Sequence, residues 1–331
     1  MRWTLPFFCL AAFLFVEKLQ AQVSFDVEMR GMLKTSAEQW LVRELQAVNP
    51  RYFDCSTKLW TIPATGNFTL YGETFFMNQQ RIDRFNELWF PRGDCRQFLS
   101  LLAMADLYMP LFKRKAEQLR LHPDVAFLPV VLSACNQQYS QDGKAGLWAL
   151  SAEVAALQNL RVDTLVDERL GGDFTTDAAL KYFASLAESF RSDWLRASLA
   201  FKWGTKELSA VDTSWHGEKL LLALRPELAD YVQFQAYTIQ LIRSVHCENQ
   251  LMNCFSILGN YEPIVIEKTM RIEDIAVVLE TDEARLRAMN PVYTGAYILP
   301  GYRRVPFVLE NTLIGRFQVM KEIIAGRKSR R

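Results

Sequence analysis

Histidine is scarce in this sequence, with three residues in 331. No cysteine–histidine spacing of the kind that holds zinc occurs, so the sequence predicts no metal site and no cofactor. A surplus of one charge is also missing, because 38 lysines and arginines face 37 aspartates and glutamates. A balance of this kind gives no indication of nucleic-acid binding.

Long apolar runs are missing after the N-terminus, so the sequence predicts no transmembrane segment. The N-terminus itself has a positive start at Arg2, an apolar run over Leu5–Val16 and a small residue, Ala21, before a cleavage point at Gln22. This three-part layout predicts a secretory signal peptide over residues 1–21 and an exported mature chain. The alternative is a buried N-terminal helix.

Cysteine is sparse, with six residues, of which five remain after the predicted cleavage. Cys247 with Cys254 and Cys55 with Cys95 are natural pairs, which leaves Cys135 as a buried free thiol in an apolar helical stretch. Seven residues of straight helix would hold the first pair about 10 Å apart. That disulfide therefore requires the helix to end between its cysteines.

Residues 22–84 show no regular pattern, although three short stretches favour strands. These are Ser24–Glu28, Leu59–Ile62 and Asn67–Tyr71. The sequence does not indicate what this segment does.

From Phe98 onward, apolar residues recur at helical spacing and predict an all-α region. One helix is expected to begin at Pro123 and to reach Cys135. Thr175 or Thr176 is expected to cap a later helix.

Near Tyr261 the pattern changes to that of a compact module. A strand at Ile264–Ile266 is followed by a helix over Ile272–Leu279, a second helix capped by Thr281, and a last strand over Arg304–Leu309. The chain then ends in a segment with basic residues at its terminus, for which a frayed, solvated end is expected.

Four segments in the middle region resemble the motifs of one enzyme family. Leu128–Ala134 resembles the helix that opens the lytic transglycosylase catalytic motif, and Ser140–Trp148 keeps the spacing of its serine-to-Gly-Leu-Trp loop. Val166–Arg169 and Ala200–Gly204 resemble two later blocks. The resemblance is strongest to the membrane-bound lytic murein transglycosylase D type, and Tyr261–Glu310 is similar to a LysM module.

The resemblance implies a mainly α fold, with a lysozyme-like helical (SLT) domain followed by a small β-α-α-β LysM-like module. Family members cleave the bond between N-acetylmuramic acid and N-acetylglucosamine in bacterial peptidoglycan and leave a 1,6-anhydro end. A periplasmic or envelope location follows. The expected divisions are 1–21 signal peptide, 22–84 segment of unknown role, 85–260 transglycosylase-like domain, 261–310 LysM-like module and 311–331 basic tail.

The family's proton donor is one glutamate, and Leu132 stands at its position. A departing glycosidic oxygen needs a proton, and general acid catalysis typically contributes about 10²–10⁴-fold in rate. Three further family residues are lost: a glutamine is Ala149, a tyrosine is Phe201 and an asparagine is Lys202. The sequence therefore predicts a fold without its catalytic acid.

Two carboxylates near the loop are candidates for a relocated acid. Glu153 follows the loop and Asp142 lies within it, although a helix start and a turn explain them equally. Glu168, in the Asp-Glu-Arg signature, is expected to be a structural ion-pair element.

Glycan contacts are predicted at Ser140, Gly146, Trp148, Lys202 and Tyr297. For Trp148, stacking on a sugar ring and packing in the core are equally consistent with the sequence. Lys202 either pairs with a muropeptide carboxylate or points to solvent, and solvent is the favoured expectation.

Three functions are consistent with these features. The first is a peptidoglycan-binding pseudoenzyme whose partners are glycan strands. The second is an active transglycosylase with a relocated acid. The third is an envelope assembly protein whose partners are other envelope proteins.

Overall fold

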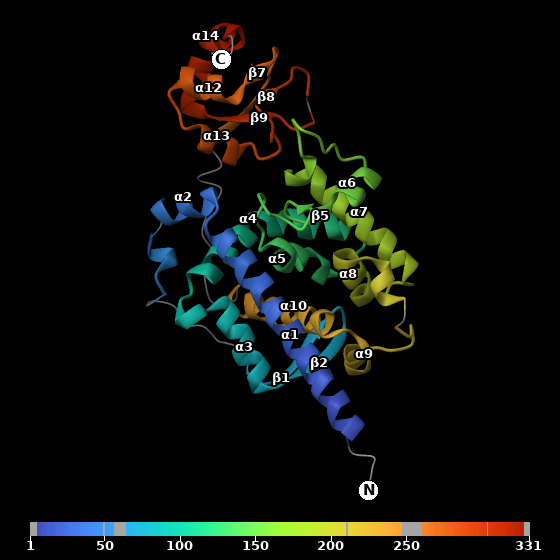
Figure 1. Cartoon of the computed structure of the whole chain (residues 1–331). Coiled ribbons are helices and arrows are strands. Elements are labelled where there is room, and N and C mark those ends of the chain that lie inside the picture. Colours follow the sequence, from blue (N-terminus) through green and yellow to red (C-terminus); the bar gives the residue numbers. More distant parts are fainter. Residues whose placement is uncertain are drawn as a thin grey trace.

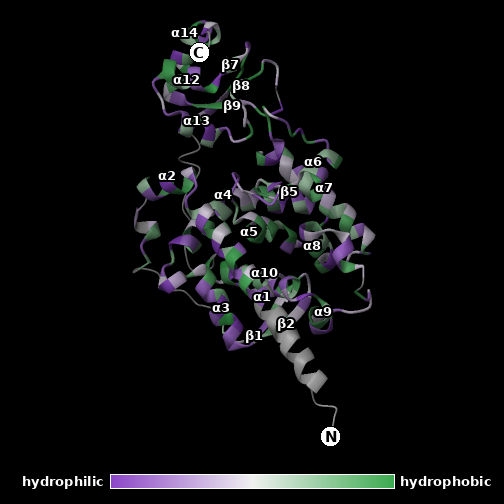
Figure 2. Cartoon of the chain, in the orientation of Figure 1, coloured by the Kyte–Doolittle hydropathy of each residue, from purple (hydrophilic) through white to green (hydrophobic). Residues whose placement is uncertain are grey.

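The computed structural model of the chain describes residues 5–48, 50–55, 64–209, 211–246, 260–302 and 304–327. The protein is mostly helical, which confirms the predicted fold class at this level (Figure 1). Hydrophobic and hydrophilic residues alternate along most helices in Figure 2, as expected of helices with one buried and one exposed side. Among the helices in the described part of the chain, none combines the length and hydrophobicity that a bilayer crossing demands.

Helix α1 (Leu5–Ala37) contains both the predicted signal peptide and the start of the predicted irregular segment. Its later half is part of the core, because Phe25, Met29 and Leu33 are buried and the helix packs against α4 and α10. The predicted strand at Ser24–Glu28 is therefore wrong. These apolar residues recur every four positions, which is helical spacing. This spacing outweighs the alternation of polar and apolar residues within Ser24–Glu28 that favoured a strand. Export and cleavage at Gln22 stay predictions.

The remainder of segment 22–84 also joins the main body. The strand predicted at Asn67–Tyr71 is confirmed as β1, which pairs antiparallel with β2, while Leu59–Ile62 lies outside the described residues. The elements are α2 (Trp40–Val48), a 3-10 turn (Pro50–Phe53), β1 (Gly66–Leu70), β2 (Glu73–Met77) and α3 (Gln79–Trp89).

The main body is built around the long helices α4 and α10, with α5 between them. The predicted helix at Pro123 begins as a 3-10 turn, and its α-helical part stops at Ala134, whose φ of 51° is left-handed. The elements are 3-10 turns at Pro91–Gly93, Pro123–Phe127, Glu168–Leu170 and Thr205–Leu208; strands β3 (Ser140–Gln141), β4 (Lys144–Ala145) and β5 (Leu150–Ser151); and helices α4 (Arg96–Gln118), α5 (Leu128–Ser133), α6 (Ala152–Leu157), α7 (Asp173–Ser189), α8 (Trp194–Trp203), α9 (Gly217–Ala223) and α10 (Pro226–His246).

The threonines expected to cap α7 lie inside its first turn. The hydroxyl groups of Thr175 and Thr176 donate to the carbonyl oxygens of Glu168 and Gly172, at 2.5 and 2.7 Å. The helix therefore begins at Asp173, and the predicted capping role is wrong.

The C-terminal module has its own hydrophobic cluster and lies at one end of the molecule (Figure 1). Its second helix is capped by Asp282, whose Oδ1 accepts from the Ala284 N–H at 2.9 Å, and not by Thr281. Strand β6 pairs antiparallel with β9, and β7 with β8. The elements are β6 (Tyr261–Ile264), β7 (Met270–Arg271), α12 (Ile272–Leu279), α13 (Glu283–Met289), β8 (Tyr297–Ile298) and β9 (Phe307–Glu310).

The segment expected as a tail forms a helix, α14 (Asn311–Gly326), over most of its length. Phe317 and Ile324 on α14 are buried in the cluster of the module. Because they are seven residues apart, both lie on one side of the helix. The sequence predicted a tail here because the basic residues cluster at the terminus, although the apolar residues before them recur at helical spacing.

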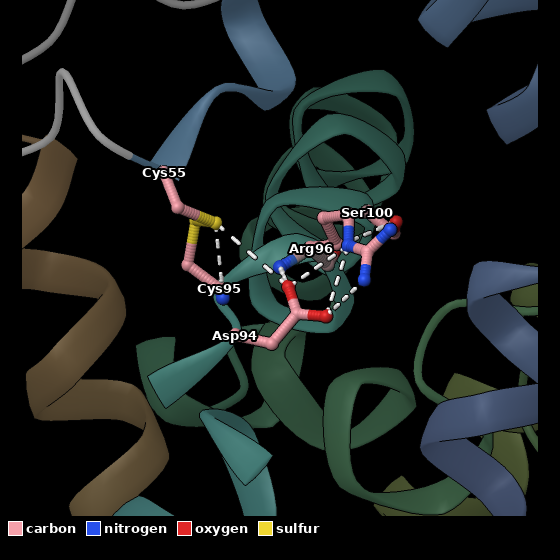
Figure 3. Close-up of a disulfide and its surroundings, with 5 residues drawn as sticks. All are labelled: Cys55, Asp94, Cys95, Arg96 and Ser100. Atoms are coloured by element: carbon pink, nitrogen blue, oxygen red, sulfur yellow. Dashed lines mark hydrogen bonds and ion pairs between the residues drawn. A yellow bond between two sulfur atoms is a disulfide. The ribbon is translucent and has the colours of Figure 1, made fainter. Parts of the chain in front are cut away.

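A disulfide joins Cys55 to Cys95 at the start of α4, which confirms that predicted pair (Figure 3). The bond closes a loop with a sequence separation of 40. Cys135 is a buried free thiol, as predicted. The pair Cys247–Cys254 lies outside the described residues.

Removing this disulfide with Cys55→Ala and Cys95→Ala is expected to lower the free energy of unfolding by about 3–4 kcal/mol. The physical reason is that a loop of this length loses conformational entropy in the unfolded chain when it is closed. Urea denaturation followed by circular dichroism measures the change. Cys135→Ala is the matched control, and an equal loss in both variants would contradict the assignment of a stabilising disulfide.

Candidate functional site

Three of the four positions at which the sequence departs from the transglycosylase pattern border one cavity. The fourth, Phe201, packs against the rings of Trp148 and Tyr182 and is not among the described residues of the lining. Leu132 near the end of α5, Ala149 before β5, and Lys202 on the last turn of α8 all border the cavity. Its volume is about 140 Å³. Six other residues complete its lining: Glu28, Tyr139, Gln141, Asp142, Lys144 and Trp203.

The wall of the cavity is apolar at Leu132. Leu132 and its neighbour Ser133 are buried. The Ser133 hydroxyl lies 2.7 Å from the Leu147 carbonyl oxygen and 3.1 Å from that of Pro129. These contacts tie α5 to the loop that carries Ala149. Leu132 therefore has a fixed place in the wall, with no proton to give.

An ion pair crosses the cavity. Lys202 Nζ lies 2.7 Å from Glu28 Oε1, and the Lys202 side chain is only 9% exposed. The ammonium also lies over the rings of Trp203 and Tyr231, at 5.0 and 5.1 Å from their centroids. The expectation that Lys202 points to solvent is therefore wrong. Its partner, Glu28, lies on α1, in a stretch for which the sequence predicted a short strand.

Glu28 is the site residue that sequence reasoning missed. The signal that could have found it is the helical spacing of Phe25, Met29 and Met32, which places Glu28 beside the buried side of the same helix.

A second lysine and a tyrosine complete the polar lining. Burial, together with the nearby Lys202 charge, lowers the pKa of Lys144, whose Nζ donates to the Lys202 carbonyl oxygen. Burial raises the pKa of Tyr139 to about 12, and the charges of Glu28 and Asp142 add to the shift. Tyr139 therefore retains its proton at neutral pH and is a poor acid.

The two candidates for a relocated acid differ in position. Asp142 lines the cavity at its exposed rim, in the turn between β3 and β4. Glu153 is exposed in the first turn of α6 and is not among the described residues that line the cavity. A hydrogen bond with Ser151 holds the pKa of Glu153 below its ordinary value. A general acid needs the opposite shift, toward the working pH.

Two of the predicted glycan contacts have structural roles. Trp148 is fully buried, and its Nε1 donates to Thr176 Oγ1 at 3.0 Å, so core packing is the one of its two alternatives that the structure shows. Gly146 has a φ of 79°, and a Cβ there would lie 1.8 Å from the Arg169 carbonyl oxygen. Glycine is required at that close approach.

The other predicted contacts lie apart from one another. Ser140 is exposed on β3, next to Gln141 of the cavity lining. Tyr297 is exposed on β8 of the module and does not border the cavity.

Glu168 has the predicted structural role, and its partners come from both parts of the molecule. The carboxylate is buried, accepts the Tyr302 hydroxyl, and lies 3.0 Å from Arg304 Nη1 and 2.7 Å from the Arg161 backbone nitrogen. Tyr302 and Arg304 belong to the module. This carboxylate therefore fixes the module to the main body.

A larger cavity lies at the same junction. Its volume is about 430 Å³, and Trp40, Tyr108 and Tyr261 are among its lining residues. That volume is typical of small-molecule sites, which range over about 300–1,000 Å³. The cavity at Leu132 is well below the range. No cluster of residues suited to a metal ion occurs in the described part of the chain.

No protein-family model matches this chain, and no curated protein matches it. The resemblance to lytic transglycosylases therefore depends on the four motifs, three of which contribute residues to the lining of one cavity.

The Glu28–Lys202 pair is expected to show a coupling energy of about 1 kcal/mol in a double-mutant cycle of Glu28→Gln and Lys202→Met. The Lys202 ammonium is largely shielded from water, so losing its partner costs more than losing a surface contact. Urea denaturation of the four proteins gives this value. The control cycle uses Glu207→Gln and Arg225→Met, an exposed pair at 2.6 Å for which about 0.5 kcal/mol or less is expected. Equal coupling energies in the two cycles would contradict a stabilising, largely buried Glu28–Lys202 ion pair at the cavity.

Proposed function

We propose that the protein binds peptidoglycan in the bacterial envelope, on a lysozyme-like transglycosylase fold that has lost its chemistry. One observation carries the proposal. The positions of Leu132, Ala149 and Lys202, which depart from the family pattern far apart in the sequence, border a single cavity. Changes that meet in one place are expected when a catalytic centre is lost as a unit.

The chemistry of the cavity supports the loss of cleavage. Glycosidic bond breaking needs a protonated acid beside the departing oxygen. Leu132 offers none, Tyr139 holds its proton too tightly, and Glu28 Oε1 is engaged by the Lys202 ammonium. The cavity is also too small to bury a sugar chain.

The module supports the retention of binding. Its elements run as two strands, two helices and two strands, and the outer strands β6 and β9 with the two helices give the strand-helix-helix-strand order of the LysM modules that it resembles. Tyr297 and Leu299 are exposed at one edge, and Tyr297 is in register with Arg271 on the paired strand β7. An exposed aromatic ring can cover the apolar C–H surface of an N-acetylglucosamine ring.

Co-sedimentation with insoluble peptidoglycan tests the proposal, with the supernatant analysed for anhydro-ended fragments. Sedimentation of the protein without fragments is the expected result. Fragments would show an active enzyme with another acid, for which Asp142→Asn and Glu153→Gln are the first variants to assay. Neither binding nor fragments would favour an assembly protein with protein partners.

Leu132→Glu alone is expected to yield no anhydro-ended fragments, because Ala149, Phe201 and Lys202 remain unsuited to holding the sugar. The variant that adds Ala149→Gln, Phe201→Tyr and Lys202→Asn is expected to release them. Chromatography of peptidoglycan digests measures both, and circular dichroism checks that each variant is folded. Full cleavage by the single variant would contradict a loss shared among the four positions.

Tyr297→Ala is expected to weaken binding to peptidoglycan by about 3–10-fold, because an aromatic contact of this kind contributes roughly 0.5–1.5 kcal/mol. Binding isotherms from co-sedimentation at increasing peptidoglycan give the affinity. Phe76→Ala is the matched control, since Phe76 is an exposed aromatic residue on β2 of the main body. An equal effect of the two substitutions would contradict sugar binding by the module.

A further inference from the structure

A third cavity is lined by residues from the end of α4, from the 3-10 turn at Pro123–Phe127 and from α10. Its volume is about 800 Å³, which is within the range of about 300–1,000 Å³ typical of small-molecule sites. None of its described lining residues borders the cavity at Leu132 or the cavity at the module. It is therefore a separate site on the main body.

The walls of this cavity are apolar and almost out of reach of water. Met109 and Ala116 on α4, Phe127 in the turn and Ile242 on α10 are each 5% exposed or less. A surface that receives a protein partner exposes its apolar residues as a patch. Because these side chains are enclosed, the cavity suits a thin apolar chain better than the surface of another protein.

Three basic side chains adjoin the apolar walls. Lys113 Nζ lies 5.7 Å from the centroid of the Phe127 ring, and Arg243 Cζ lies 5.4 Å from the same centroid. Both charges are therefore next to the apolar lining. Arg120, just beyond the end of α4, is the third base in the lining.

The protein does not fully neutralise these bases. Arg243 pairs with the buried Asp124 at 2.5 Å, whereas Lys113 and Arg120 form no ion pair within the described residues. Glu117 is the acidic residue in the described lining. Three bases against Glu117 and Asp124 leave a surplus of one positive charge. This surplus is complementary to a ligand that carries one negative charge.

Arg120 has a backbone conformation that favours another residue type. Its φ is 54°, in the left-handed region. Its N–H donates to the Glu117 carbonyl oxygen at 2.9 Å, and the Leu121 N–H donates to that of Ala116 at 3.0 Å. Glycine is the usual residue at this position of such a helix ending. Strain of this kind is often retained at functional sites, and here it brings a guanidinium group to the cavity.

We propose that this cavity binds a free amphiphilic anion of the fatty-acid class. The carboxylate lies among the three bases, where it accepts charge-assisted hydrogen bonds, and the alkyl chain lies along the apolar walls. The proposal goes beyond glycan binding. It uses no residue of the module or of the cavity at Leu132, so the two proposals fail separately.

Isothermal titration calorimetry of the purified full chain with decanoate tests the proposal. Decanol carries the same alkyl chain without the charge, and acetate carries the charge without the chain. Decanoate is expected to bind, and decanol is expected to bind at least about tenfold more weakly, because the contacts between its head group and the bases lose their charge. Acetate is expected to give no detectable heat of binding.

Lys113→Gln is expected to weaken the binding of decanoate by about tenfold and to leave that of decanol unchanged. Arg114→Gln is the matched control, since Arg114 is an exposed base beside Lys113 on α4 and is not among the described lining residues. It should leave the affinity for decanoate unchanged.

Arg120→Gly separates ligand binding from stability. The substitution should raise the melting temperature by about 1–3 °C, because glycine adopts the left-handed conformation without strain. It should nevertheless weaken the binding of decanoate by about tenfold. An Arg120→Gly variant that keeps its affinity would contradict the placement of the head group.

Three results would overturn the proposal: no binding of decanoate, equal affinities for decanoate and decanol, or equal losses in Lys113→Gln and Arg114→Gln. Vesicles of anionic phospholipid provide a further test. Binding to the vesicles that Lys113→Gln weakens, with no binding of free decanoate, would assign these bases to a membrane surface and would also overturn it.

Discussion

The ammonium of Lys202 is enclosed by Trp203, Tyr231 and the end of α8, and Glu28 is the carboxylate that lies against it. A largely buried charge of this kind requires a partner. The pair joins α1 to α8 across the cavity that Leu132 borders, so it helps to position the first helix. In our proposal, this contact occupies the cavity and glycan binding belongs to the module.

A buried carboxylate, that of Glu168, joins the module to the main body. Glu168 belongs to the signature that resembles the transglycosylases, yet two of its partners, Tyr302 and Arg304, come from the module. This part of the chain therefore has a structural role.

Much of the helical body could be predicted from the sequence, because apolar residues from Phe98 onward recur at the spacing of an α-helix. Helix α1 could not, since Ser24–Glu28 also alternates between polar and apolar residues and a strand satisfies that pattern locally. The helical spacing of Phe25, Met29 and Met32 favours the helix, and the packing of these residues against distant helices decides between the two. Trp148 illustrates the same limit at the site: the motif places it beside the cavity, but its direction depends on Thr176 and Phe112, which tertiary structure supplies.

Hydrogen–deuterium exchange of the purified protein, with and without soluble peptidoglycan fragments, tests the central claim most directly. The account predicts new protection at residues 297–300 of the module and no change at residues 132–149 or at Lys202. Protection around Leu132 and Lys202 with none in the module would show that the cavity still opens to hold glycan, and would contradict the account.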